Sequence, residues 1–293
     1  MTVAARVATA REPGAVVALP LETVGDRAGR RTAVVDPIQA RAYAAATNDR
    51  NAAYLDGRYA PPVFGVVPTW DVSIDTLNRV VPPEAWPGLL HADQDMRFHR
   101  PLVPGMTLST WAEISTIRAT RMGAWVTVWI QSEGDDGDLV LEQFSTMFIR
   151  GLRGPEDMGP ERPQHDFPEE ARDRLVAEVV RHVDDDQTLR YRDASGDDNR
   201  IHWDEAYAKD ANLPGIIVHG LCTMAMCGSV VVDEVAGADP GRLARLAVRF
   251  ARPVFPGDEL SVAVYDVGPG TYAFEAKARG KVVVRDGRAE VRG

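Results

Sequence analysis

The chain has 293 residues, of which 45% are hydrophobic and 26% charged, a composition typical of a globular protein with one large or two smaller cores. Its formal net charge of −10 argues against nucleic acid and anionic membrane surfaces as partners, because both require a basic face. The sequence also lacks an apolar run of the roughly 18 residues that a transmembrane helix needs, so we expect no membrane span.

The N-terminal segment and the cysteines indicate the cellular setting. Residues 1–30 hold no continuous apolar core, so we expect a disordered lead here and not a signal peptide. The spacing of Cys222 and Cys227 fits neither a zinc site nor a secreted disulfide framework. A reducing cytoplasm is therefore the expected compartment.

In the first half of the chain, a pattern typical of helices is followed by one typical of strands. A helix is predicted at Asp36–Ala46, where Asp36 can cap the first turn and Pro37 can occupy its first position. A second apolar helical stretch follows at Phe64–Val80. Alternating and β-branched residues then predict four strands with a hairpin turn at residues 134–137, namely Asp93–Phe98, Met106–Ile117, Gly123–Ser132 and Leu139–Arg150.

The second half repeats this order after a segment at 151–174 that lacks periodicity and is predicted to be a linker. A strand at Ala177–Val183 and a short helix at Asp185–Ala194 precede a long apolar helix at His219–Val235. Four further strands are expected at Leu243–Phe250, Glu259–Val267, Thr271–Ala278 and Val282–Val291. Helices followed by consecutive strands favour an α+β fold with antiparallel sheets over βαβ winding. The helix at 219–235 carries almost no charge on any face, so it must be buried, most simply inside a wrapped sheet.

Two pairs of segments show that the chain is an internal duplication. At a shift of 148 residues, six positions are identical: Tyr43, Asp49, Asn51, Asp56, Tyr59 and Ala60 match Tyr191, Asp197, Asn199, Asp204, Tyr207 and Ala208. At a shift of 152, RFHRPLVPG at 97–105 matches RFARPVFPG at 249–257. Each unit of about 130 residues is long enough for one domain. The informative mismatch is Tyr54, which stands opposite His202.

The second unit carries a carboxylate and an imidazole on one loop. Turn-forming residues run from Ser195 and Gly196 through Asp197 to Asn199. On such a loop, Asp197 and His202 can face one cleft, hold a water molecule and move its proton, as general acid–base catalysis requires. The alternative is that Asp197 and Asn199 only cap a turn and that His202 packs against it.

The next segment, LPGIIVHG at 213–220, leads into the N-terminus of the apolar helix. The unpaired N–H groups and the positive dipole end of a helix N-terminus suit a developing oxyanion. Gly220 has no side chain and would let a carbonyl oxygen approach the backbone closely. The alternatives are that Gly220 is a tight packing position and that His219 packs or caps.

The two motifs together, YRDASGDDNRIH at 191–202 and PG followed by HGLCT at 214–223, resemble the MaoC-like, or type 2 (R-specific), enoyl-CoA hydratase family. The resemblance covers most of residues 176–293, and residues 30–150 resemble, more weakly, the N-terminal dehydratase domain of two-domain members. It implies a double hot-dog fold, with two antiparallel sheets that each wrap around a long buried helix. The implied organisation is a lead at 1–30, a degenerate hot-dog at 31–150, a linker at 151–174 and a catalytic hot-dog at 175–293.

The resemblance also implies an activity and the residues that perform it. Asp197 and His202 would be the catalytic pair, Asn199 would orient the site, and the Gly220 N–H would hold the thioester oxygen. The implied reaction is the reversible hydration of trans-2-enoyl thioesters of coenzyme A or acyl carrier protein to (3R)-3-hydroxyacyl thioesters, by a homodimer, without a metal or other cofactor. Further substrate contacts are expected from Ser195, Gly196, Arg200, Pro214, Gly215 and His219.

This sequence departs from the family pattern at two positions. Arg200 replaces a usual proline, so it would either loosen the loop or contact a phosphate. Tyr54 leaves Asp49 without an imidazole partner, so the first unit is expected to be non-catalytic and to accommodate the acyl chain.

Some alternatives stay open at this stage. Four arginines could reach phosphates, although structural ion pairs are the favoured interpretation: Arg97, Arg100, Arg249 and Arg252. Two other functions also remain, namely an acyl-thioester-binding partner without turnover and a thioesterase.

Overall fold

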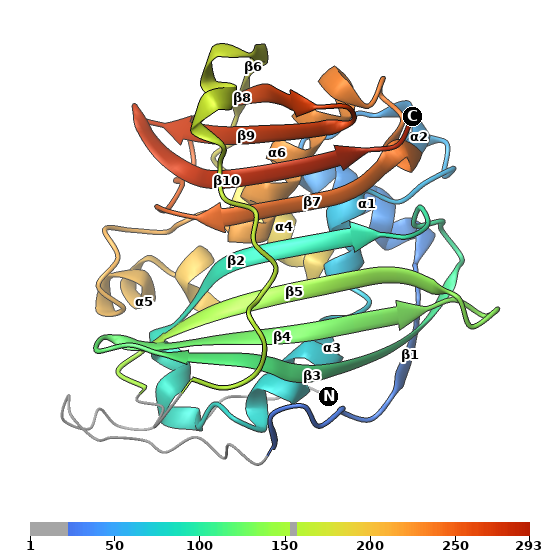
Figure 1. The fold of residues 1–293 in the computed structure, drawn as a ribbon. Helices are drawn as coiled ribbons and strands as arrows, with labels where there is room; N and C mark the ends of the chain where they lie inside the picture. The colour runs from blue at the N-terminus through green and yellow to red at the C-terminus, as the bar shows by residue number, and fades with distance from the viewer. Residues whose placement is uncertain (1–22, 153–156) are drawn as a thin grey trace.

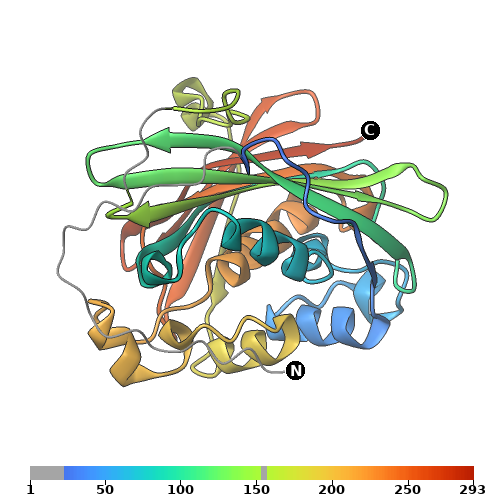
Figure 2. The same cartoon turned by 90° about the horizontal axis from the view of Figure 1, so that it is seen from below.

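The computed structural model describes residues 23–152 and 157–293 (Figure 1). The first 22 residues of the expected lead lie outside the described residues. The described chain forms one antiparallel sheet of ten strands in the order β1-β3-β4-β5-β2-β7-β10-β9-β8-β6. The helices gather on one face of this sheet, and the segment that joins the two units crosses the other face (Figures 1 and 2). The expected α+β class is confirmed.

The elements follow the predicted order in both units. The first unit contains β1 Arg31–Val34, α1 Pro37–Ala46, α2 Ala52–Leu55, η2 Pro62–Val66, α3 Trp70–Asn78, η3 Pro83–Gly88, β2 Leu89–Phe98, β3 Thr107–Ala119, β4 Gly123–Glu133 and β5 Leu139–Arg150. The second contains η4 Glu169–Asp173, β6 Leu175–His182, α4 Gln187–Ser195, η5 Arg200–His202, α5 Glu205–Asp210, α6 Gly220–Val235, η6 Pro240–Arg242, β7 Leu243–Phe250, β8 Glu259–Gly268, β9 Thr271–Ala278 and β10 Lys281–Val291. Within residues 23–152 and 157–293, every helix is too short or too polar to cross a membrane.

The predicted cap of α1 forms as expected. The Oδ1 atom of Asp36 accepts hydrogen bonds from the N–H groups of Ile38 and Gln39, both at 2.8 Å. Pro37 occupies the first helical position, where its missing N–H has no intrahelical partner to lose. These local interactions fix the start of the helix that packs against α4 of the second unit.

The two expected sheets are joined into one, which corrects the prediction of two separate sheets. The equivalent strands β2 and β7 pair antiparallel, with Asp95 opposite Ala247, Asp93 opposite Arg249 and Arg97 opposite Arg245. Since Asp95 and Ala247 are themselves equivalent at the 152-residue shift, a local two-fold axis passes between them. The pairing gives hydrogen-bond partners to two edges that would otherwise stay open.

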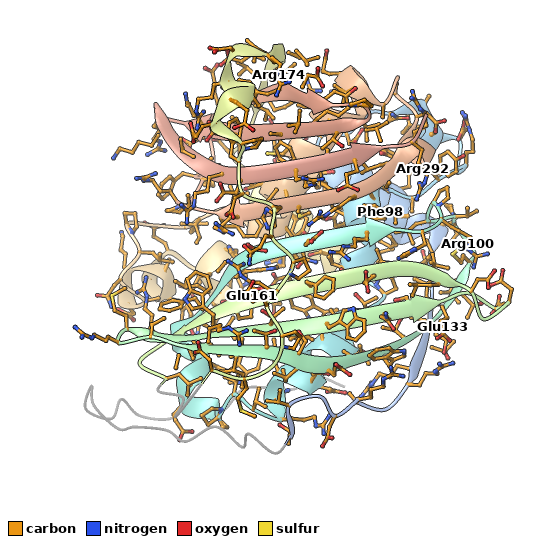
Figure 3. All side chains as sticks on the ribbon, viewed as in Figure 1. Phe98, Arg100, Glu133, Glu161, Arg174 and Arg292 are labelled. Carbon is orange, nitrogen blue, oxygen red and sulfur yellow. The ribbon has the colours of Figure 1, made fainter. Side chains whose placement is uncertain are left out.

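Further contacts join the two units across this axis. The hydroxyl groups of Tyr43 and Tyr191, which are equivalent at the 148-residue shift, lie 3.1 Å apart in the buried interface of α1 and α4. At the sheet seam, Arg292 from the C-terminal end donates to the carbonyl oxygen of Phe98 on β2, and the two residues lie together in Figure 3. The duplicated units therefore share one core.

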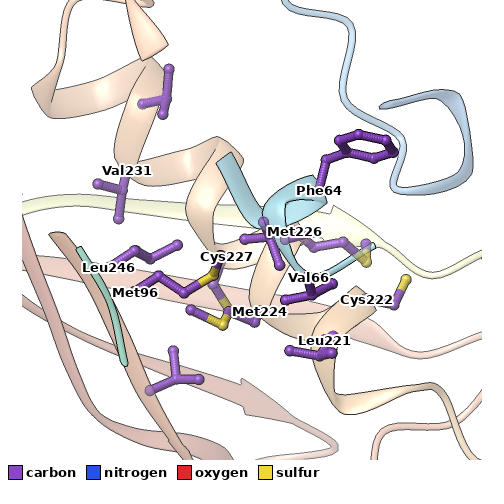
Figure 4. Close-up of a cluster of buried hydrophobic side chains, with 14 of the residues drawn as sticks. Phe64, Val66, Met96, Leu221, Cys222, Met224, Met226, Cys227, Val231 and Leu246 are labelled. Atoms are coloured by element: carbon purple, nitrogen blue, oxygen red, sulfur yellow. The ribbon is translucent and has the colours of Figure 1, made fainter. Parts of the chain in front are cut away.

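The second unit wraps around α6 as predicted. Its residues from Leu221 through Val232 are all buried. Figure 4 shows sulfur-bearing and aliphatic side chains of α6 between Phe64 and Val66 of η2 on one side and Met96 and Leu246 of the paired strands on the other.

The first unit has no equivalent long helix: within the predicted helical stretch at Phe64–Val80, only α3 at Trp70–Asn78 is an α-helix, so the predicted start is wrong. The chain forms the short η2 turn, is interrupted around Pro68, and resumes as α3. Proline lacks an N–H donor and its ring collides with the preceding turn, which accounts for the break. α3 then packs on β3 and β4 in a second, smaller core, with Val72 and Leu77 among its buried residues. Only one of the two hot-dog units thus surrounds a long helix.

Candidate active site

The loop that carries the predicted catalytic residues is held by its own polar groups. α4 ends at Ser195, and Gly196 follows with a φ of 82°, a left-handed conformation that favours glycine. The Asp197 N–H donates to Ser195 Oγ at 3.2 Å, and Asp197 Oδ1 accepts from the Asn199 N–H at 3.2 Å. Asn199 is exposed and its Oδ1 accepts from the Ile201 N–H at 3.3 Å. These turns bring the chain back so that Asp197 and η5 lie side by side.

The structure brings Asp197 and His202 together with His219. The side-chain oxygen or nitrogen atoms of these three residues lie within 4.8 Å of one another. His202 is buried, and its Nδ1–H donates to the carbonyl oxygen of Ile217 at 2.9 Å. Because neutral imidazole has one donor and one acceptor nitrogen, this bond leaves Nε2 of His202 as the acceptor.

Burial acts on the two groups in opposite directions. It raises the pKa of the Asp197 carboxyl, an effect that the nearby His202 partly offsets. It lowers the pKa of His202, although Asp197 and the Ile217 carbonyl favour the charged form. His202 is therefore neutral near pH 7 and able to accept a proton, as a general base must be.

His219 contacts both members of this pair. Its ring stacks on that of His202, with centroids 3.7 Å apart and planes 26° apart. Another neighbour is the Tyr191 ring, whose centroid lies 4.7 Å from that of His219. Its Nε2–H donates to the Asp197 carbonyl oxygen at 3.1 Å. Burial lowers its pKa to about 2, so the ring is neutral. In the described part of the chain, His219 Nδ1 is one of the few buried side-chain atoms without a hydrogen-bond partner.

The same three residues have the chemistry of metal ligands, but their geometry does not suit one ion. The lone pair of an imidazole nitrogen lies in the plane of its ring. Since the rings of His202 and His219 are stacked face to face, their lone pairs point along nearly parallel planes and do not converge. The arrangement fits proton transfer better than metal binding.

Gly220 begins α6 directly beside this cluster. The first N–H groups of a helix have no intrahelical partner, and the dipole of a helix of 16 residues adds positive potential there. A Cβ atom on Gly220 would lie 3.3 Å from the Phe250 ring, which is tight for such a contact. A glycine at this position thus lets the helix start lie against the ring.

The remaining predicted residues lie on the surrounding loops. Arg200 forms an ion pair with Asp204, and its guanidinium lies 4.6 Å from the centre of the Tyr207 ring, so it is engaged within its own segment. Pro214 is exposed, and Gly215 lies against the carboxylate of Glu205.

The predicted structural role of the arginines is confirmed for three of the four. Arg97 pairs with Glu142 at 3.3 Å, and Arg100 pairs with Asp136 at 2.6 Å. Arg249 pairs with acidic residues from three segments: Asp93, Asp166 and Asp286. The fourth, Arg252, donates to the carbonyl oxygen of Val282.

Sequence reasoning missed two residues that border the site. Phe250 packs on Gly220, and Tyr191 packs on His219. Tyr191 had a signal in the sequence, since it recurs as Tyr43, but its contact with His219 joins residues that are far apart in the chain. Phe250 also recurs, as Phe98, but nothing in the repeat indicates that its ring lies against Gly220.

The equivalent position in the first unit is nearly filled. Asp49 and Tyr54 line a cavity of about 10 Å³, room for roughly one water molecule. Burial raises the pKa of Asp49 to about 6, and the buried Tyr54 hydroxyl has no hydrogen-bond partner within the described chain. Ala225, Gly228 and Ser229 of α6 form one wall, so the long helix of the second unit fills the space.

Comparisons with known proteins agree with this architecture. Residues 166–287 match the MaoC like domain, and residues 22–143 match the FAS1-like dehydratase domain region. The chain is 35% identical over 213 residues to 3-hydroxyacyl-thioester dehydratase Y of Mycobacterium tuberculosis, covering 69% of this chain and 72% of that protein. It is 26% identical over 240 residues to the probable enoyl-CoA hydratase 2 of Dictyostelium discoideum, covering 80% and 81%. The crystal structure of a MaoC-like dehydratase from Phytophthora capsici superposes with a TM-score of 0.80 at 25% identity, over 92% of this chain and 97% of that one.

Two conclusions follow from the fold, the site and these matches. The architecture is a double hot-dog, in which the two units share one continuous sheet. The chain belongs to the MaoC-like dehydratase family, which is related to the type 2 enoyl-CoA hydratases.

Proposed function

We propose that this protein is a hydro-lyase that reversibly adds water to trans-2-enoyl thioesters and forms (3R)-3-hydroxyacyl thioesters. The observation that carries the proposal is the convergence of Asp197 and a neutral His202 beside the N-terminus of α6. The names of the relatives, a 3-hydroxyacyl-thioester dehydratase and a probable enoyl-CoA hydratase 2, support the same chemistry.

Each part of the site has a role in this reaction. The thioester oxygen accepts a hydrogen bond from the Gly220 N–H, and the helix dipole stabilises the negative charge that develops there. Polarisation of the carbonyl draws electron density away from C3. Asp197 and Nε2 of His202 hold a water molecule and take its proton as the water oxygen bonds to C3.

The proton balance closes at the same pair. The π electrons of the C2–C3 double bond form a C–H bond at C2, with a proton delivered from the Asp197–His202 pair on the same face. Water is thus added across the double bond, and the pair returns to its starting state. The reverse sequence removes water from the 3-hydroxyacyl thioester.

The first unit supports the second without catalysis in this proposal. Tyr54 has no basic nitrogen, and the cavity beside Asp49 has no room for an acyl chain. The acyl group of a thioester bound at Gly220 instead extends toward the first unit. Cytoplasmic location, a homodimer and a coenzyme A or acyl carrier protein thioester complete the proposal.

The test follows crotonyl-CoA hydration by absorbance at the enoyl band. Asp197→Asn and His202→Ala are each expected to lower kcat/KM by at least about 100-fold, because each removes a group that moves the proton. Asp49→Asn, the matched change in the first unit, should leave it within about twofold. Near-normal turnover in either of the first two variants would contradict the mechanism. Release of free thiol would indicate a thioesterase, and thioester binding without turnover would indicate a non-catalytic partner.

A further inference from the structure

A chain of neutral polar side chains lies on the inner face of β2 and β5, in the unit that lacks a catalytic pair. Gln143 Nε2 donates to Thr69 Oγ1 at 3.0 Å, and Gln94 Nε2 donates to Gln143 Oε1 at 3.3 Å. His91 Nε2 is 3.1 Å from Gln94 Oε1 and 3.3 Å from Ser145 Oγ. The chain thus runs from the helical layer at Thr69 to the sheet at His91.

A break in strand register places His91 on this face. Asp93 and Asp95 point to the outer face, where they meet Arg249 and Arg245, so strict alternation would also send His91 outward. The pairing of β2 with β5 shifts register between His91 and Asp93. A β-bulge of this kind redirects a side chain, and bulges are frequent next to active sites.

Phe250 connects His91 to the candidate active site. The rings of His91 and Phe250 meet edge to face at 5.3 Å, and the same Phe250 ring lies against Gly220. His91, Phe250 and Gly220 are all partly exposed, whereas the next members of the polar chain, Gln94 and Gln143, are each 1% exposed. Through the Phe250 ring, the partly exposed end of the polar chain therefore lies next to the helix start that we propose holds the thioester.

The chemistry of this end defines what it can bind. Burial lowers the pKa of His91 to about 4, so the ring is neutral and offers one donor and one acceptor. Ser145 adds a hydroxyl group that can donate or accept. No charged group belongs to the chain, so an acyl carboxylate would lack a counter-ion there. His91 Nε2 and Ser145 Oγ bond to each other, and an oxygen on the acyl group can join this network as a further partner, whereas an entirely apolar acyl group cannot.

We propose that His91 is a specificity-determining residue which, with Ser145, binds a neutral hydroxyl or keto oxygen carried by the acyl chain beyond C3. The inference rests on the proposed function only for the position of the thioester at Gly220. It assigns the substrate to the class of oxygenated acyl thioesters. The polar chain behind His91 fixes the ring for this contact.

The experiment measures binding of saturated thioesters, which cannot react. Affinities of the full-length protein are compared for octanoyl-CoA and for octanoyl-CoA derivatives with one hydroxyl or keto oxygen at C4, C5, C6 or C7. We expect at least one derivative to bind about fivefold more tightly than octanoyl-CoA, which corresponds to the roughly 1 kcal/mol that a matched hydrogen bond contributes. In His91→Phe, which keeps a ring against Phe250, this preference should disappear while octanoyl-CoA binding stays within about twofold.

Controls separate this inference from the proposed function. The same substitution at the exposed His99 should change nothing, and Ser145→Ala should weaken the preference even if His91→Phe fails to fold. Equal affinity of the wild type for all derivatives would overturn the inference, as would a preference that survives both changes. Crotonyl-CoA hydration without any preference would overturn the inference alone. A preference without hydration would overturn the proposed function alone.

Discussion

Gly220 starts the long helix against an aromatic ring, and this contact makes the position sensitive to a single added methyl group. In Gly220→Ala the new Cβ would lie 3.3 Å from Phe250, which must then move by a few tenths of an ångström. We expect kcat/KM for crotonyl-CoA to fall about 10- to 100-fold, because the N–H groups that hold the oxyanion move with the helix start. The melting temperature should stay the same or rise slightly, because alanine favours helix.

A second substitution tests the cause of that loss. Gly220→Ala combined with Phe250→Leu relieves the contact and should recover part of the activity relative to Phe250→Leu alone. Loss of the same size in both backgrounds would mean that the ring contact is not responsible.

At the residue scale, the sequence predicted the meeting of Asp197 with His202, because both lie on one short turn-rich loop whose motif resembles the family's catalytic segment. The stacking of His219 on His202 was not predictable in the same way. That contact joins a helix start to a separate loop, and the packing of both on the sheet sets their distance. Residue spacing along the chain identifies equivalent positions in the two units, but it does not identify which side chains from other segments pack against them.

At the scale of elements, the two units differ most in the helix that follows the repeated loop. Pro68 interrupts the first helix, whereas α6 continues and closes the cavity of Asp49 and Tyr54. The strand boundaries agreed with prediction to within a few residues, because alternation is a local signal. The helix break was misjudged because the apolar run was taken to outweigh Pro68 near its start, whereas the proline interrupts the helix there.

The closed first-unit cavity leads to a stability prediction. Burial raises the pKa of Asp49 to about 6, above the value of about 3.9 in an unfolded chain. The folded state therefore retains the proton as pH rises through this window and is penalised above it. Asp49→Asn should raise the free energy of unfolding by about 1–2 kcal/mol at pH 8, a value reduced from that of a fully buried carboxyl because Asp49 is partly exposed to water. At pH 3.5 it should change the free energy of unfolding little. Urea unfolding at both pH values measures this, and equal gains at both would contradict it.

The segment between the two units forms a strap over the seam. The His165 ring is buried, with Nε2 3.1 Å from the Asp93 carboxylate and Nδ1 2.5 Å from the Asp286 carbonyl oxygen. Burial opposes the charged forms of both groups. Their hydrogen bond nevertheless raises the pKa of His165, and it lowers that of Asp93 together with Arg162 and Arg249. The predicted linker is thus a structural element that binds β2 and β10.

This strap predicts a pH-dependent contribution to stability. The stabilisation from charged His165 is fully present below its unfolded pKa of about 6.5 and is lost as pH rises through the higher folded value. At pH 5.5, His165→Gln should lower the free energy of unfolding by about 1–3 kcal/mol, as expected for a buried charged hydrogen bond. At pH 9 the difference should be clearly smaller. A constant difference across this range would show that His165 acts only as a neutral packing residue.

At the scale of the whole molecule, duplication produced one sheet from two. The sequence indicated two equivalent units but not that β2 and β7 would pair, because an antiparallel pair of equivalent strands requires a two-fold axis that no single unit contains. The seam also explains two arginines of β7. Arg245 and Arg249 pair with Asp95 and Asp93 of β2, two carboxylates that are buried where the units join.

Arg245 gives the most direct test of that seam. Its Nε and Nη2 atoms hold both oxygens of Asp95 at 2.9 and 2.7 Å, and Asp95 is only 1% exposed. In Arg245→Ala the nearest remaining guanidinium is that of Arg97 at 3.7 Å, so a carboxylate stays buried and poorly paired. Removing one partner of a buried pair typically costs about 3–5 kcal/mol, which we expect to see in urea unfolding.

The matched control is Arg100→Ala, which removes an equally bidentate pair with Asp136 at the exposed hairpin. Exposed pairs contribute roughly 0–1 kcal/mol, because water and salt screen them. Similar losses in both variants would mean that the seam adds nothing beyond an ordinary surface pair. A large loss in Arg245→Ala alone would instead show that the pairing of the two units stabilises the protein. Arg245 lies on β7, the strand that pairs with β2 of the first unit, and not on an active-site loop.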